Sequence, residues 1–145
     1  MKVWIGVDPG EKRIGLARSD ALGVLATPRG LAGNRQELLR WIVEVEEDFG
    51  LAGILIGCPR NMDGSFGPMA LRSLELSRWL RELTEVPVRL WDERLTTRQA
   101  HGIGGQSSVD EKAAAILLQS YLDAGTPPSP DPPGLLEADQ QKNDE

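Results

Sequence analysis

The sequence predicts an α/β fold in which helices cover both faces of a mixed five-stranded sheet, and three observations favour it. The chain has 145 residues, of which 40% are hydrophobic and 26% charged, so it is long enough to bury the core of one domain. Its first part contains short apolar segments separated by turn residues, which is typical of an antiparallel meander. Beyond it, longer segments with helical spacing alternate with short apolar runs, which is typical of strands joined by helices.

Three strands are predicted at the amino-terminal end. Residues 2–8 are rich in β-branched and apolar side chains, and turn residues follow directly at 9–12. Residues 14–18 return as a second strand, so the two strands form a hairpin. Residues 24–27 are expected to form the third strand of the meander.

The remaining elements follow from hydrophobic periodicity. The predicted helix over 34–49 repeats apolar residues at helical spacing, and residues 54–57 are a continuous apolar run, the pattern of a buried strand. A helix over 68–83, a strand over 86–91, a short helix over 97–101 and a final helix over 109–123 complete the prediction. The order is therefore strand-strand-strand-helix-strand-helix-strand-helix-helix. The change from antiparallel to parallel pairing is expected beside the first strand.

Residues 126–145 are predicted to be a tail separate from a single domain over 1–125. Five prolines lie between Gly125 and Gly134, and they exclude a regular helix there. The tail carries five acidic residues against Lys142 alone, so it accounts for −4 of the net charge of −6. We expect it to be disordered, with a docking peptide as the alternative. The body is close to neutral, and nucleic acid stays a candidate partner.

Several classes of protein are excluded or disfavoured. No segment reaches the roughly 18–20 apolar residues of a membrane span, and the amino-terminal apolar stretch meets a charge at Asp8, too early for a secretory signal. Cys58 is the only cysteine and His101 the only histidine, so a disulfide framework, a Cys/His zinc cluster and a Ser-His-Asp triad are not supported. We expect a cytoplasmic protein with no membrane partner.

Three carboxylates occur where a solvated surface would not place them. Asp8 ends an apolar strand, Glu93 follows another strand, and Asp110 lies in the first turn of the final helix. Ligands of open α/β sheets bind at strand ends beside the point where strand order changes. If these carboxylates converge, protonation or a cation must offset their repulsion, and such oxygen-rich sites select Mg²⁺ or Mn²⁺. Asp92 is expected to face away from Glu93, because successive strand residues point to opposite faces.

Each carboxylate also has an ordinary structural explanation. Asp8 can open a turn, Glu93 can pair with a neighbouring arginine, and Asp110 can favour a helix amino terminus. Residues 108–111 also match a capping box.

Basic and polar residues flank the three acids along the chain. If strand ends gather them, they form a rim that holds a polyanion by its phosphates, and the alternative is ordinary solvated charge. The candidates for nucleic-acid binding are Lys12, Arg13, Arg60, Asn61, Arg94 and Arg98, with Arg18 as a further basic neighbour.

Four blocks of the sequence resemble the YqgF/RuvX family of bacterial proteins. They are GVDPGEKRIGLA at 6–17, NMDGS at 61–65 with Gly67, DERLTT at 92–97, and residues 109–123, and they occur in the family's order. Members often carry a Lys/Arg-rich stretch before the last aspartate, whereas residues 101–108 contain neither residue type. The tail also lies outside the shared pattern.

The resemblance implies a ribonuclease H-like fold and a metal-dependent nuclease whose catalytic and metal-binding residues are Asp8, Glu93 and Asp110. It further implies 5′-end processing of precursor 16S ribosomal RNA, cleavage of branched DNA as in Holliday-junction resolvases, or both. A ribosome-assembly partner is a further expectation. Symmetric cutting of a four-way junction needs two active sites, which would require a homodimer.

Two other functions stay open at this point. The turn after Asp8 is similar to the first phosphate-binding hairpin of actin-like ATPases and sugar kinases, although those proteins close two such domains on the nucleotide. A non-catalytic module that binds nucleic acid without cutting it is the second alternative.

Overall fold

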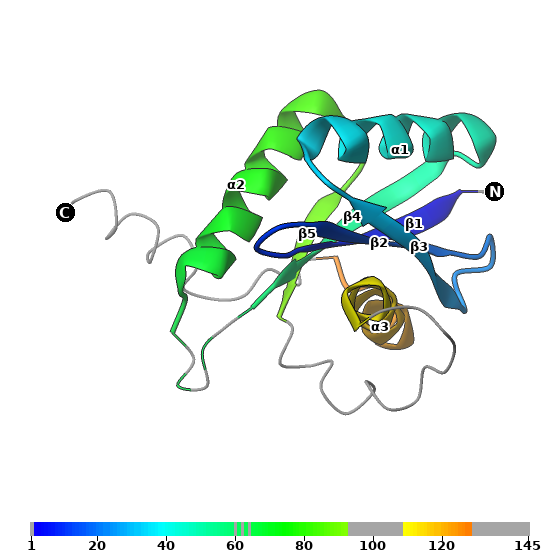
Figure 1. Cartoon of the computed structure of the whole chain (residues 1–145). Coiled ribbons are helices and arrows are strands. Elements are labelled where there is room, and N and C mark those ends of the chain that lie inside the picture. The colour runs from blue at the N-terminus through cyan, green and yellow to red at the C-terminus, as the bar shows by residue number, and fades with distance from the viewer. Residues whose placement is uncertain (1, 60, 62, 64, 93–108, 129–145) are drawn as a thin grey trace.

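Five strands form one mixed sheet (Figure 1). The computed structural model describes residues 2–128 apart from 60, 62, 64 and 93–108, and for residues 109–111 it describes the backbone. The strands are β1 (Val3–Pro9), β2 (Ile14–Ser19), β3 (Ala26–Ala32), β4 (Leu51–Cys58) and β5 (Val88–Asp92), in the order β3-β2-β1-β4-β5 across the sheet.

Strand β1 lies at the centre, where the direction of pairing changes. It pairs antiparallel with β2, so that Asp8 lies opposite Gly15, and parallel with β4, so that Val7 lies opposite Ile56. Strand β4 pairs parallel with β5, and Cys58 lies opposite Asp92. The carboxyl ends of β1, β4 and β5 therefore share one edge of the sheet, as expected.

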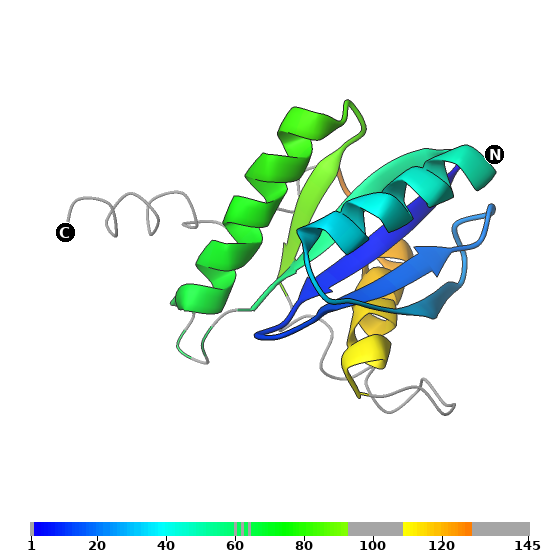
Figure 2. The same cartoon turned by 45° about the horizontal axis from the view of Figure 1, so that its top comes forward.

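Helices cover both faces of the sheet, which confirms the predicted architecture (Figures 1 and 2). Helices α1 (Arg35–Asp48) and α2 (Pro68–Leu83) lie on one face, and α3 (Val109–Asp123) lies on the other. Their bounds agree closely with the predicted helices. The short helix expected over 97–101 lies outside the described residues.

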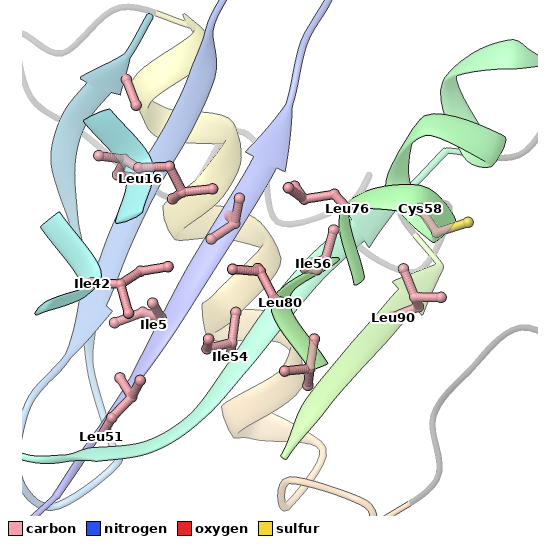
Figure 3. Packing of buried hydrophobic residues seen from close by; sticks show 14 of the residues in the cluster. Ile5, Leu16, Ile42, Leu51, Ile54, Ile56, Cys58, Leu76, Leu80 and Leu90 are labelled. Atoms are coloured by element: carbon pink, nitrogen blue, oxygen red, sulfur yellow. The ribbon is translucent and has the colours of Figure 1, made fainter. Parts of the chain in front are cut away.

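The core has two parts, separated by the sheet. Apolar side chains from one face of the strands pack against α1 and α2, and Figure 3 shows this part with α3 behind the sheet. The opposite face packs against the α3 residues Ala114, Leu117, Leu118 and Tyr121. Residues 114, 117 and 121 recur at helical spacing, so they share this inward face of the helix.

The third strand is displaced from its predicted position, because β3 begins at Ala26 and continues to Ala32. Val24 and Leu25 instead belong to a turn, where both backbone N–H groups donate to the Asp20 carboxylate. Pro28 and Gly30 are tolerated in β3 because it is an edge strand, with an irregularity in its pairing to β2.

None of the helices in the described part of the chain combines the length and the apolar character that crossing a bilayer requires.

Candidate active site

Asp8 lies at the carboxyl end of the central strand and is half-buried. Alternation along β1 places Trp4, Gly6 and Asp8 on the face that α3 covers. The Trp4 ring packs edge-on against Tyr121 of α3, with 5.2 Å between ring centroids. The face to which Asp8 belongs is therefore the face of α3.

Helix α3 runs antiparallel to β1, and their contacts fix which residues lie side by side. Tyr121 contacts Trp4, and one turn or two earlier the helix contacts Gly6. A methyl group on Gly6 would lie only 2.9 Å from the Leu118 Cβ atom and 3.1 Å from the Ala114 carbonyl oxygen. The helix backbone therefore approaches the strand as closely as a glycine allows.

The same register brings the first turn of α3 towards Asp8. Asp8 lies two residues beyond Gly6 on β1, which is a distance of about 6.6 Å along the strand. Asp110 lies one turn before Ala114 on α3, which is a distance of about 5.4–6 Å along the helix. Figure 2 shows the yellow first turn of α3 at the end of the sheet that carries the β1–β2 turn. The side chain of Asp110 itself lies outside the described part of the structure.

The third predicted carboxylate, Glu93, follows the last residue of β5 and lies outside the described residues. Its neighbour Asp92 is buried, and alternation with Val88 and Leu90 assigns it to the face of α1 and α2. Asp92 and Asp8 therefore belong to opposite faces of the sheet.

Asp8 lines two surface pockets. The first, of about 440 Å³, is formed by the β1–β2 hairpin and includes Glu11, Lys12 and Arg13. The second, of about 400 Å³, lies between this hairpin and the start of α2, and its lining includes Glu11, Asn61 and Gly67. Glu11 lines both pockets, although it is not among the site residues predicted from the sequence; its position in the turn directly after Asp8 was the available signal.

The hairpin turn presents Lys12 and Arg13 to solvent beside Asp8. The Gly10 N–H donates to the Arg13 carbonyl oxygen over 2.8 Å, and a methyl group on Gly10 would lie 2.7 Å from that oxygen. The turn is thus too tight for a side chain at position 10. Lys12 and Arg13 lie in this tight turn.

The loop before α2 is held by its own polar groups. The Asn61 N–H donates to the Ser65 carbonyl oxygen, and the Asp63 carboxylate accepts hydrogen bonds from the Ser65 hydroxyl at 2.6 Å and the Ser65 N–H at 2.9 Å. Both hydrogen bonds lower the pKa of Asp63, and the bond from the Ser65 hydroxyl has the larger effect. Asn61 is exposed and faces the second pocket.

The start of α2 borders the same pocket. Gly67 is the N-cap and offers no side-chain hydrogen bond, and Pro68 occupies the first turn. The amide groups at this helix end therefore have no side-chain acceptor on the N-cap residue, and helix N-termini attract anions.

One predicted member of the basic rim is placed elsewhere. Arg18 lies opposite Ile5, three residues from the level of Asp8, and its guanidinium stacks 4.1 Å from the Phe49 ring centroid. Burial and then the nearby Arg29 lower its pKa, while Asp48 raises it. Arg60, Arg94 and Arg98 lie outside the described residues.

The described residues alone do not complete a metal site. Among them, no three His, Cys, Asp or Glu side chains are close enough to hold an ion. The predicted set fits a hard cation in its chemistry, since all three ligands are carboxylates and one of them is half-buried beside a helix amino terminus.

Comparisons with known proteins identify relatives over most of the chain. A family model described as RuvX, Holliday junction resolvase, matches residues 2–124. A protein from Syntrophomonas wolfei named "Putative pre-16S rRNA nuclease" is 35% identical over 133 residues, covering 84% of this chain and 94% of that protein. A protein of the same name from Nocardioides sp. is 41% identical, covering 83% and 87%.

Solved structures give the same fold. Thermus thermophilus RuvC in complex with a Holliday junction substrate aligns with a TM-score of 0.50 at 17% identity, over 87% of this chain and 98% of that chain. This likeness shows a ribonuclease H-like fold, as expected from the sequence. Because the family model spans nearly the whole described fold and the relatives match over most of both chains, this chain belongs to the RuvX family of nucleases, which are hydrolases acting on ester bonds.

Proposed function

We propose that this chain is a divalent-metal-dependent nuclease that processes the 5′ end of precursor 16S ribosomal RNA. The observation that carries the proposal is the register of β1 against α3, in which the close contact at Gly6 leads to Asp8 on the strand and Asp110 on the helix. The names of the relatives support precursor 16S ribosomal RNA as the substrate.

In this proposal Asp8, Glu93 and Asp110 hold Mg²⁺ or Mn²⁺ through carboxylate oxygens. When bound, the ion supplies Lewis-acid chemistry, lowering the pKa of water and neutralising charge on phosphate oxygens. Asp8 is the central ligand, because it lies on the middle strand and borders both pockets. The positive end of the α3 dipole favours the ionised form of Asp110.

The residues around Asp8 bind and orient the substrate. Lys12 and Arg13 are exposed beside Asp8 and hold backbone phosphates, while Asn61 and the amide groups at the start of α2 contact phosphate from the other side. Arg60, Arg94 and Arg98 extend this rim in the proposal. Phosphate contacts position a nucleic acid without reading its sequence, so folded shape selects the substrate.

Branched DNA is the second candidate substrate. The family model carries the description Holliday junction resolvase, and the aligned RuvC structure contains a junction. Symmetric cutting of a junction needs two copies of the site, so this candidate includes a homodimer.

The test is a side-by-side cleavage assay on precursor 16S ribosomal RNA and on a synthetic four-way junction, each with Mg²⁺ and with Mn²⁺. We expect metal-dependent cleavage of the RNA, and Asp8→Asn lowers the rate by at least about 100-fold, because an amide is a neutral and weaker ligand. Asp48→Asn, an exposed aspartate at the end of α1, is the matched control and keeps the wild-type rate.

Two outcomes would contradict the proposal. Equal cleavage by the wild type and Asp8→Asn would remove Asp8 from the site. Tight binding of the RNA without cleavage under either metal would favour the non-catalytic module.

A further inference from the structure

An apolar groove of about 490 Å³ separates α1 from α2 at the end of the sheet opposite Asp8. We call it the α1–α2 groove. Its floor is formed by core residues that include Ile54 and Leu80, both almost completely buried. Its lips carry Val43 and Leu83, which are 47% and 52% exposed. Apolar side chains this exposed beside an apolar floor are typical of a surface that another protein covers.

The charged residues that line this groove have one sign. Glu46, Glu47 and Glu85 line it, and no lysine or arginine is among its described lining residues. Glu46 accepts a hydrogen bond from the Leu51 N–H, so its carboxylate is held over the start of β4. The groove therefore combines an apolar floor with a negative rim.

The two helices add to this negative potential. Helix α1 ends at Asp48 with no basic residue in its last turn, and α2 ends at Leu83. Figure 2 shows both helices rising towards the same end of the sheet. Arg81 in the last turn of α2 donates to the Val88 carbonyl oxygen, which directs it to β5. Two helix carboxyl ends, each with a negative partial charge, thus adjoin the groove.

We propose that the α1–α2 groove docks a basic amphipathic helix of a partner protein. Leucine-type side chains on one stripe of that helix fill the groove, and flanking lysines or arginines meet Glu46, Glu47 and Glu85. The volume admits side chains rather than a whole helix, so the partner lies along the groove. A nucleic acid is repelled by the same rim, and a second copy of this chain would bring a second set of glutamates to a symmetric interface.

The position of the groove leaves the proposed active site open. Leu51 begins β4 and Val86 precedes β5, whereas Asp8 lies at the carboxyl ends of the parallel strands. A protein docked here therefore holds the nuclease without covering the two pockets at Asp8.

The test uses the full chain and a synthetic fluorescent helix with leucines at i, i+3, i+4 and i+7 and lysines elsewhere. We expect saturable binding by fluorescence anisotropy, weakened by salt. Amide NMR shifts on binding are expected at Val43, Leu83 and their neighbours. Glu47→Lys with Glu85→Lys should weaken binding by about tenfold or more, because it reverses two charges of the rim.

Matched controls separate this site from general attraction between opposite charges. Glu44→Lys with Glu75→Lys changes two exposed glutamates of the same helices that do not line the groove, and it should keep binding within about twofold. Leu83→Ser should weaken binding without changing charge, and all variants should cleave substrate at the wild-type rate. A probe with glutamate in place of lysine should not bind.

Three results would overturn the proposal. One is equal loss of binding in the groove and control variants, and another is NMR shifts that map to Lys12 and Arg13 rather than to the groove. The third is concentration-dependent dimerisation that Leu83→Ser abolishes, because the groove would then be an interface between two copies of this chain.

Discussion

At the scale of single residues, Gly6 decides how closely α3 approaches the central strand. Any side chain here meets the Leu118 Cβ atom and the Ala114 carbonyl oxygen at distances shorter than ordinary contact. Asp110 lies one turn before Ala114 on the same helix, so a displacement at Gly6 is passed directly to the first turn of α3. The glycine therefore acts on the proposed metal site through the helix.

We predict that Gly6→Ala lowers both stability and activity. Overpacking of this contact should reduce the free energy of unfolding by about 1–3 kcal/mol and lower metal-dependent cleavage more strongly than the stability loss explains. Chemical denaturation and the cleavage assay measure the two effects. Gly33→Ala is the control, because a methyl group there meets the flexible carboxylate of Glu37. Unchanged cleavage in a destabilised Gly6→Ala would show that α3 does not position the site.

Part of the site could be predicted from the sequence, and part could not. Asp8 and the final helix follow from an apolar strand that ends in an acid and from helical spacing up to Tyr121. The closeness of β1 and α3 did not follow, because a glycine within an apolar strand has several explanations and contact appears only when the helix is placed. Arg18 was assigned to the rim because it is basic, yet its strand carries it away from Asp8.

At the scale of elements, the turn between β2 and β3 shows how a side chain overrides local β propensity. Val24 and Leu25 favour a strand by residue type, but their N–H groups donate to the Asp20 carboxylate at 2.8 and 3.2 Å. The Gln119 side chain of α3 also holds this turn, because it accepts a hydrogen bond from the Ala26 N–H and donates one to the Val24 carbonyl oxygen. The helices were easier to predict because their periodicity extends over many residues.

This turn should depend on pH. Hydrogen bonds from Val24 and then Leu25 lower the pKa of Asp20 in the folded state. The ionised Asp20 carboxylate therefore stabilises the turn fully above its unfolded pKa of about 3.9. This stabilisation is lost as the pH falls through the lower pKa of the folded state. Hydrogen exchange at Val24 and Leu25 should become less protected in that acidic window. In Asp20→Ala protection should be low at every pH, and protection equal to the wild type would show that the carboxylate does not hold the turn.

At the scale of the whole molecule, α3 joins the sheet to the start of the tail. The Tyr121 hydroxyl donates to the Pro127 carbonyl oxygen at 2.7 Å and accepts from Arg89 of β5 at 2.5 Å. Its ring lies between Trp4 and Trp91, 5.2 Å from each ring centroid. One buried tyrosine therefore contacts the central strand, the edge strand and the first tail residues. The proposed boundary between domain and tail at 125–126 lies directly beside these contacts.

We predict that Tyr121→Phe reduces the free energy of unfolding by about 1–2 kcal/mol, because it leaves Arg89 and the Pro127 carbonyl oxygen without this partner. Urea denaturation measures the loss. Combined with Arg89→Met, the effect should be smaller than the sum of the two single changes, since both remove the same hydrogen bond. Strict additivity would show that the two side chains act independently.

The proposed metal site is also a property of the whole molecule, because its proposed ligands are far apart in the sequence: Asp8 in the first strand, Glu93 directly after the sequence of β5, and Asp110 in the last helix. Calorimetric titration of Mn²⁺ into the wild type, Asp8→Asn, Glu93→Gln, Asp110→Asn and the control Asp48→Asn tests it without a substrate. We predict that the wild type and the control bind Mn²⁺ alike, and that each of the other three variants loses affinity by at least about tenfold. Equal Mn²⁺ affinity in all five proteins would contradict a shared ion.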